Sequence, residues 1–143
     1  MKISSRFTVA VHILSLLSIY PNPLPTSDMI AGSVNTNAVV IRRILGMLKS
    51  AGLVDMKRGT GGSYLTKHIE DINLLEVYKA VDVVDTGGLF QVHQNPNINC
   101  PIGANIQSVI EVTLFSAQES MENVLKNVTM LDVVSDFNEK INK

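Results

Sequence analysis

Apolar residues near the start of the chain recur every three or four positions, which is the spacing of an amphipathic helix. Between residues 4 and 20 this spacing links Phe7, Val11, Leu14 and Leu17, with Ile13 beside them. Three prolines follow at positions 21, 23 and 25, and proline cannot continue a helix. The pattern therefore predicts a first helix over residues 4–20.

Two further helices are predicted next, separated by a tight turn. Residues 26–28, Thr-Ser-Asp, are all of a type that caps helix N-termini, so a short second helix is expected there, before a turn at residues 32–35. Thr36 or Asn37 is expected to cap a third helix that ends at residues 51–52, where glycine suits a C-terminal cap. The apolar face of this third helix is predicted to be Val40, Ile44, Leu45 and Leu48. Two helices joined in this way form a helix-turn-helix pattern.

The pattern then changes to strand-like alternation. Residues 53–57 alternate between apolar and polar, residues 58–62 read Arg-Gly-Thr-Gly-Gly, and residues 63–66 can return as a second strand. This order predicts a β-hairpin, the wing of a winged helix-turn-helix. A fourth helix is predicted over residues 72–84, followed at residues 89–99 by an irregular loop rich in Asn and Gln.

A long helix is predicted from Pro101 to about Val128, because proline suits the first helical position and nothing breaks the chain before then. At 1.5 Å per residue it would be about 39 Å long, more than a domain of this size covers by itself. We expect the same helix of a second chain to cover it, although packing on the first helix of its own chain is an alternative. The predicted dimerisation stripe has a heptad-like spacing and comprises Ile110, Leu114, Ala117, Met121, Val124 and Val128. A short last helix is expected over residues 131–141.

The composition fits one folded domain or two very small ones. The 143 residues have a mass of 15.6 kDa and are 45% hydrophobic and 17% charged, which is typical of a globular chain. No apolar run approaches the roughly 20 residues of a membrane helix. Polar residues interrupt the first twenty positions, and no small-residue cleavage site follows them. We therefore expect a cytoplasmic protein without a membrane partner.

Charge is distributed unequally along the chain. Residues 1–67 carry eight basic and two acidic side chains, a net charge of +6, whereas residues 68–143 carry four basic and eleven acidic ones, a net charge of −7. A basic half that contains a helix-turn-helix pattern indicates contact with double-stranded DNA. We predict a winged helix-turn-helix DNA-binding domain at residues 1–70 and a helical dimerisation and sensor region at residues 71–143.

The expected DNA contacts follow from the way a recognition helix enters the major groove by its N-terminal end. Asn37 and Arg42 are the expected base readers, since Asn pairs well with adenine and Arg with guanine. At the wing tip, Arg58 is expected to enter a narrow minor groove. The full predicted set, which includes phosphate contacts, is Thr36, Asn37, Val39, Arg42, Arg43, Lys49, Lys57, Arg58, Gly59 and Thr60.

Cys100, the single cysteine of the chain, is the candidate reactive group of the second half. It precedes Pro101 at the start of the long helix, where free amides and the helix dipole favour the thiolate. Two readings stay open: a sensor thiol that is oxidised to a sulfenic acid or a disulfide, and an inert thiol. A thiol-dependent enzyme with His93 as the base is a further alternative. No metal site is expected, because the three histidines lie far apart and form no ligand pair at helical spacing.

Two strings carry a resemblance to a known family. Residues 48–54, Leu-Lys-Ser-Ala-Gly-Leu-Val, and residues 58–65, Arg-Gly-Thr-Gly-Gly-Ser-Tyr-Leu, resemble the Rrf-type winged-helix repressors, the bacterial IscR, NsrR and CymR group. The resemblance extends over nearly the whole chain. It implies a homodimer on a palindromic operator, with the long helix forming the dimer and Arg58 in the minor groove. One departure is Ser63, where the family usually has glycine.

A second departure concerns the effector. Cluster-binding members of the family use three cysteines before the long helix, and Cys100 resembles the last of these. One thiolate is too few for the usual ligation of an iron–sulfur cluster, so no such cofactor is expected.

The sequence therefore predicts a mainly α winged helix-turn-helix protein with a small β-hairpin wing and a long C-terminal dimerisation helix. We interpret it as a homodimeric, sequence-specific transcriptional repressor and not an enzyme. Its effector is expected to be an oxidant acting on Cys100, a small molecule or a partner protein. The main alternative is a regulator whose basic half docks on an acidic protein surface.

Overall fold

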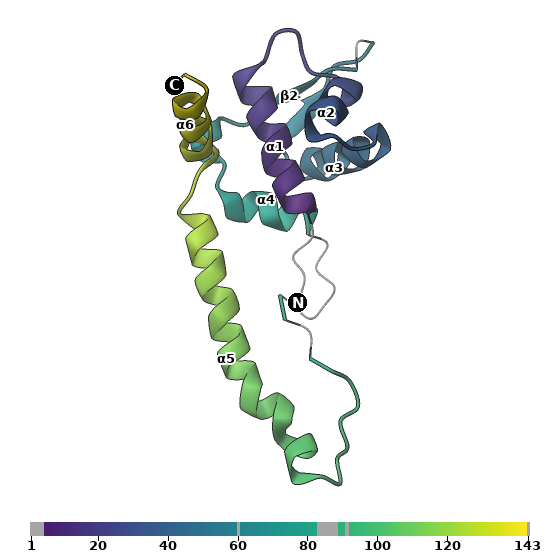
Figure 1. The fold of residues 1–143 in the computed structure, drawn as a ribbon, viewed down its shortest axis with the longest axis vertical. Helices are drawn as coiled ribbons and strands as arrows, with labels where there is room; N and C mark the ends of the chain where they lie inside the picture. Colours follow the sequence, from purple (N-terminus) through teal and green to yellow (C-terminus); the bar gives the residue numbers. More distant parts are fainter. Residues whose placement is uncertain (1–4, 60, 83–88, 91, 143) are drawn as a thin grey trace.

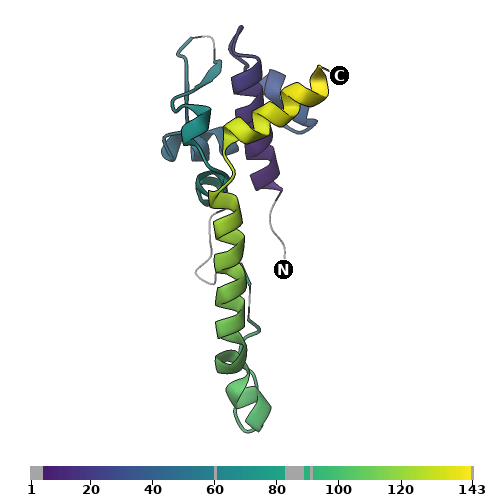
Figure 2. The ribbon, with the colours of Figure 1, turned by 90° about the vertical axis from the view of Figure 1, so that its left-hand side faces the viewer.

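Helices dominate the computed structural model, which describes residues 5–59, 61–82, 89–90 and 92–142. In chain order the elements are α1 (Arg6–Ile19), α2 (Ser27–Val34), α3 (Ala38–Ser50), β1 (Val54–Met56), β2 (Ser63–Leu65), the 3-10 turn η1 (Ile69–Asp71), α4 (Leu74–Val81), α5 (Pro101–Lys126) and α6 (Met130–Ile141). All the elements except α5 gather at one end, and α5 projects from them (Figures 1 and 2). This confirms the predicted winged helix-turn-helix with a long C-terminal helix. Among the described residues, no helix is both long and apolar enough to span a bilayer.

The turn between α2 and α3 is shorter than the sequence predicts. Residues 32–34 continue α2 instead of forming a turn, so that part of the prediction was wrong. The helix ends because Asn35 adopts a left-handed conformation (φ 64°) and its backbone N–H donates to the carbonyl of Ala31, a geometry that Asn tolerates better than most residues. Asn37, one of the two predicted caps, then starts α3 by accepting a hydrogen bond from the Val39 N–H at 2.7 Å.

The buried face of α3 also differs from the prediction at one position. Val40 was expected in the core, but 37% of its surface is exposed, while Ile41 is fully buried. The reason is geometric: residues 41, 44, 45 and 48 follow the i, i+3, i+4, i+7 rule and lie on one face of a helix. Val40 lies about 100° away from Ile41 around the helix axis.

The core is built around α1, which contacts α2, α3, α4, α6 and β2. It includes residues from both sides of the predicted domain boundary at residue 70: Ile13, Leu14, Ile44 and Leu48 before it, and Ile72, Val77, Val81 and Met130 after it. The predicted boundary therefore does not coincide with a gap in the packing. Helices α4 and α6 complete the core of the winged-helix part.

The wing is anchored to the segment before α2. Strands β1 and β2 pair antiparallel, with Val54 opposite Leu65 and Met56 opposite Ser63. Gly62 forms an isolated bridge with Thr26, and the Ser63 N–H donates to the carbonyl of Pro25 at 2.9 Å. A Cβ atom at Gly62 would lie 2.5 Å from the Cβ of Leu24, so this close approach requires glycine.

Helix α4 is shorter than predicted. It begins at Leu74 because the Asn73 side chain accepts from the Glu76 N–H at 2.9 Å, and it ends at Val81; residues 83–84 of the predicted helix lie outside the described residues. Ile72 is buried just before it. Two backbone bonds, Leu74 N–H to the Val128 carbonyl and Met130 N–H to the Ile72 carbonyl, both 2.8 Å, join the start of α4 to the start of α6.

Helix α5 spans 26 residues and has no buried residue along its whole length. This helix contacts α4. The residues of the predicted dimerisation stripe differ in exposure. Leu114, Met121 and Val128 are partly buried, whereas Ile110, Ala117 and Val124 are exposed. The most exposed apolar side chains of the helix lie largely outside the predicted stripe: Ile102, Val109, Val112, Phe115 and Val124.

Candidate nucleic-acid interface

The residues predicted to meet DNA come from α3, the turn before it and the wing. Nine of the ten predicted residues lie in the described part of the chain, and all nine are exposed. Thr60, the tenth, lies outside the described residues. The cations come from two elements, Arg42 and Arg43 from α3 and Lys57 and Arg58 from the wing.

A groove of about 470 Å³ lies between α2, α3 and the wing. Arg42 and Leu45 line it from α3, and Met56 and Gly61 line it from the wing, while the start of α2 and its cap supply Thr26, Ser27 and Asp28. The fold thus brings Arg42 beside the wing, although their separation in sequence gives no sign of this. Residues 26–28 were predicted only as a cap, because the bridge that places the wing against them is a long-range contact.

Two predicted contacts already have partners within the chain. The side-chain oxygen of Asn37 is used in the cap of α3, which leaves its NH₂ group as the free donor. Lys49 Nζ lies 3.4 Å from the Asp55 carboxylate. The Met56 amide and the Lys49 ammonium hold the pKa of Asp55 below its ordinary value. The Asp55 carboxylate therefore offsets part of the positive charge of Lys49.

The wing tip combines cations with unusual backbone geometry. Lys57, Arg58 and Gly59 are exposed, and Gly59 has a φ of 92°, which side chains rarely adopt. The turn is closed by two backbone bonds, from the Lys57 N–H to the Gly62 carbonyl at 2.8 Å and from the Gly61 N–H to the Lys57 carbonyl at 3.2 Å. These bonds close the turn on which the exposed Arg58 lies.

Cys100 lies at the other end of the molecule, as the N-terminal cap residue of α5. Its thiol is exposed, and the backbone amides of Gly103 and Ile102 lower its pKa by hydrogen bonding. The preceding turn packs closely on the helix, because a side chain at Gly103 would meet the carbonyl of Asn97. The position predicted from the sequence, next to the free amides of a helix start, is confirmed.

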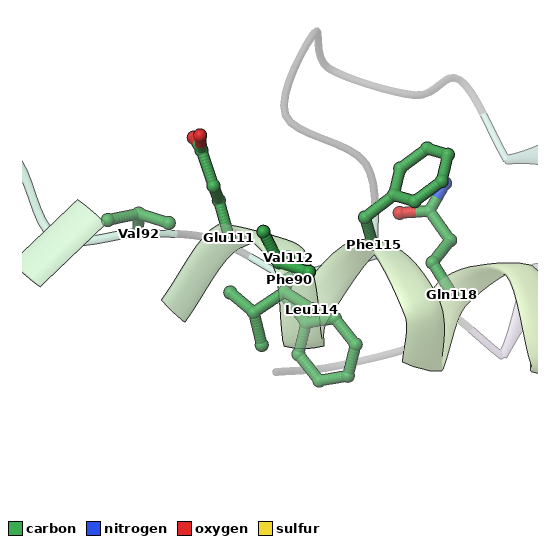
Figure 3. A pocket seen from close by; sticks show the side chains of 7 residues that line it. All are labelled: Phe90, Val92, Glu111, Val112, Leu114, Phe115 and Gln118. Carbon is green, nitrogen blue, oxygen red and sulfur yellow. The ribbon is translucent and has the colours of Figure 1, made fainter. Parts of the chain in front are cut away.

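A second groove, also of about 470 Å³, lies between Phe90, Val92 and the middle of α5. Phe90, Val92, Val112, Leu114 and Phe115 make it mainly apolar, and Glu111 and Gln118 add polar groups. The Leu89 N–H donates to the Gln118 side-chain oxygen at 3.0 Å and ties the loop to the helix. The Glu111 carboxylate points away from the Phe90 ring (Figure 3). This groove could not be predicted from the sequence, since Asn- and Gln-rich loops carry no periodic signal.

Comparison with known proteins now adds to this geometry. The family model Rrf2, described as an iron-dependent transcriptional regulator, matches residues 3–136. The chain belongs to the Rrf2 family. It is therefore a member of a family of transcriptional regulators and not of enzymes, so the thiol-dependent enzyme alternative is wrong.

Relatives and solved structures agree with this assignment. The Bacillus subtilis (strain 168) protein YwnA, named as an HTH-type transcriptional regulator, is 45% identical over 133 residues, which cover 93% of this chain and 97% of YwnA. A crystal structure presented as that of a DNA-binding protein has 41% identity and a TM-score of 0.74, and covers 90% of this chain and 98% of its own. IscR of T. potens, at 20% identity and a TM-score of 0.71 over 98% of this chain and 90% of its own, shares the fold.

The iron named in the family description does not fit the residues of this chain. The sequence has one cysteine, and one thiolate per chain is fewer than cluster ligation uses. Within the described ranges, no three His, Cys, Asp or Glu side chains lie close enough together to hold a metal ion. We therefore derive no function from iron.

The environment of Cys100 predicts a pH profile for its alkylation. Because the pKa of the thiol is lowered in the folded chain, its thiolate persists to a lower pH than that of an ordinary cysteine. The rate of reaction with iodoacetamide should therefore rise through a lower pH midpoint in the folded protein than in the unfolded chain. The protein unfolded in urea, which lacks the α5 amides, serves as the control and should return the ordinary midpoint. Equal midpoints in the two states would contradict this placement of the thiol.

Proposed function

We propose that the chain is a homodimeric, sequence-specific DNA-binding repressor. The observation that carries this proposal is a groove that Arg42 of α3 lines together with Met56 and Gly61 of the wing. Three further exposed cations lie on α3 and the wing, namely Arg43, Lys57 and Arg58, in the half of the chain with a net charge of +6. In the proposed complex the N-terminal end of α3 enters the major groove and Arg58 enters the adjacent minor groove. A dimer bound in this way would cover its operator, which is a common route to repression. The proposal uses no metal or cluster.

Membership of a regulator family supports DNA binding over the alternative in which the basic half docks on an acidic protein surface. The two readings differ in salt dependence and in sequence preference. DNA binding should weaken steeply as salt rises, because neutralised phosphates release counterions, and it should retain a preferred site over random duplex.

The homodimer is supported by the exposed apolar surface of α5. Val109 and Val124 are 71% and 65% exposed on a helix without a buried residue. Together with Ile102 and Ala117 they lie at spacings of seven or eight, which repeat along one side of a helix. Leaving such a stripe in water is unfavourable, and the same stripe of a second chain would cover it. A two-fold dimer of this kind presents two recognition helices to a palindromic operator.

Removing the wing arginine should weaken DNA binding without affecting folding. For Arg58→Ala we expect a loss of about 1 to 3 kcal/mol in binding free energy and a reduced preference for A·T-rich flanks. Fluorescence anisotropy at fixed salt on a duplex selected from a random library measures both effects. Lys67→Ala is the matched control, since Lys67 is a basic residue of the same half that pairs with Glu76 at 2.8 Å. An Arg58 variant that binds as well as the Lys67 variant would contradict the proposed wing contact.

Placing a charge on the exposed stripe of α5 should dissociate the dimer. Val109→Glu would bury a carboxylate in the proposed interface, so we expect the dimer dissociation constant to rise by about tenfold or more. Sedimentation equilibrium measures this constant, and circular dichroism checks that helix content is unchanged. Ser108→Glu places the same charge on the neighbouring exposed position, about 100° around the helix, and should leave the dimer intact. A Val109→Glu variant that stays dimeric would exclude this stripe as the interface.

We also propose that Cys100 makes repression responsive to peroxides. The thiolate sulfur would attack one peroxide oxygen, so that an S–O bond forms and the O–O bond breaks. The sulfur becomes a sulfenic acid, oxidised by two electrons, and the leaving oxygen takes up a proton. The exposed thiol and the two α5 amides that stabilise its thiolate support this step.

The peroxide response can be tested with one substitution. Wild-type protein should lose affinity for its selected duplex after treatment with hydrogen peroxide and regain it with dithiothreitol. The Cys100→Ser variant should bind the duplex as the reduced wild type does. Peroxide should not change its affinity, because serine has no oxidisable sulfur. An equal loss of binding in both proteins would exclude Cys100 as the sensor.

A further inference from the structure

Val39 is an apolar side chain in a position that the packing of the protein does not explain. It is the second residue of α3, and 52% of its surface is exposed. The core-facing residues of this helix are Ile41, Ile44, Leu45 and Leu48, and at 100° per residue Val39 points away from them. Its isopropyl group therefore lies on the outer face at the N-terminal end of the proposed recognition helix.

The neighbours of Val39 on the helix surface are both cations. Residues three and four positions apart are adjacent on a helix, so Val39 lies beside Arg42 and Arg43. The next residue, Val40, has the same side chain but a different environment. Its neighbours by the same rule are Arg43 and the buried Ile44, and it is 37% exposed. Val39 is thus placed between the two arginines, whereas Val40 lies closer to the core.

The outer face of α3 that carries Val39 also carries a glycine. Gly46 lies seven residues after Val39, on the same side of the helix, and it is exposed. A Cβ atom there would meet nothing within 4 Å, so packing among the described residues does not require glycine, although glycine weakens a helix interior. The bare backbone at this position leaves room for another surface to approach α3 closely.

We infer that Val39 reads thymine, by packing its isopropyl group against the C5 methyl of a thymine in each operator half-site. The inference rests on the proposed function. Valine has no donor or acceptor in its side chain, and the thymine methyl is the one apolar group that unmodified base pairs present in the major groove. The flanking Arg42 and Arg43 supply contacts to guanine or phosphate on either side.

Removing single methyl groups from the DNA tests this contact. The site is first selected from a random duplex library with the full-length wild-type protein. Each thymine is then replaced by deoxyuridine, which removes the C5 methyl and leaves base pairing unchanged. We expect the dissociation constant at fixed salt to rise about fourfold for each symmetry-related thymine that loses its methyl group. Other thymines should tolerate the replacement.

Two variants assign the effect to one side chain. In Val39→Ala, binding to the thymine site should be weaker and the uracil penalty at that position should disappear. Val40→Ala is the matched control and should keep the full penalty. Thermal unfolding checks that both variants fold. We expect them to fold because the side chains of Val39 and Val40 are exposed.

Three outcomes would overturn the inference, and they are distinguishable. Specific binding with no thymine sensitive to methyl removal would leave the proposed function intact and exclude methyl reading. A penalty that persists in Val39→Ala would assign the methyl contact to another residue. A protein that selects no sequence and shows no salt-dependent duplex binding would overturn the proposed function, and this inference with it.

Discussion

The apolar contact between α1 and its neighbours is the constraint on which the other parts of the molecule depend. Ala10, Ile13 and Leu14 of α1 are fully buried, and α1 contacts α3, α4 and α6. Burial of these side chains fixes the rotation of α3, because Ile41, Ile44, Leu45 and Leu48 must share the same core. Because that face of α3 is buried, Val39, Arg42 and Arg43 must point outward.

The same core connects the two ends of the protein. Helix α5 carries Cys100 at its start, and it contacts α4, which in turn contacts α1 and α3. Arg6 at the start of α1 pairs with Asp82 at 3.7 Å, just after α4, and the ring of Phe7 packs edge-on against Tyr78 at 6.0 Å. Burial raises the pKa of Tyr78, so its hydroxyl stays protonated. A chain of packed elements therefore joins α5, which begins at the exposed thiol, to α3.

The corrections to the predicted elements share a physical cause. Val40 was assigned to the core on its spacing of four from Ile44, yet Ile41 satisfies more of the helical spacings and is the residue that packs. A turn was predicted at residues 32–35, but the structure has it at residues 35–37. Glycine at position 32 tolerates a helix, and Asn35 ends α2 by adopting the left-handed conformation. On α5, heptad spacing could not distinguish the side that meets α4 from the side that faces solvent. In each case a local pattern had two solutions, and packing selected one.

The sequence by itself determined the order and type of the elements, since caps, prolines and helical spacing act over a few neighbouring residues. The cap of α3 at Thr36 or Asn37, the proline start of α5 and the unequal charge of the two halves are of this kind. Tertiary structure alone decided which residues meet across long separations. It placed Thr26 against Gly62, brought Arg42 beside the wing, and added α4 and α6 to the core of the DNA-binding part. Such contacts depend on the apolar surface that the whole chain buries when it folds. A short segment of the sequence does not show which distant residues it will contact.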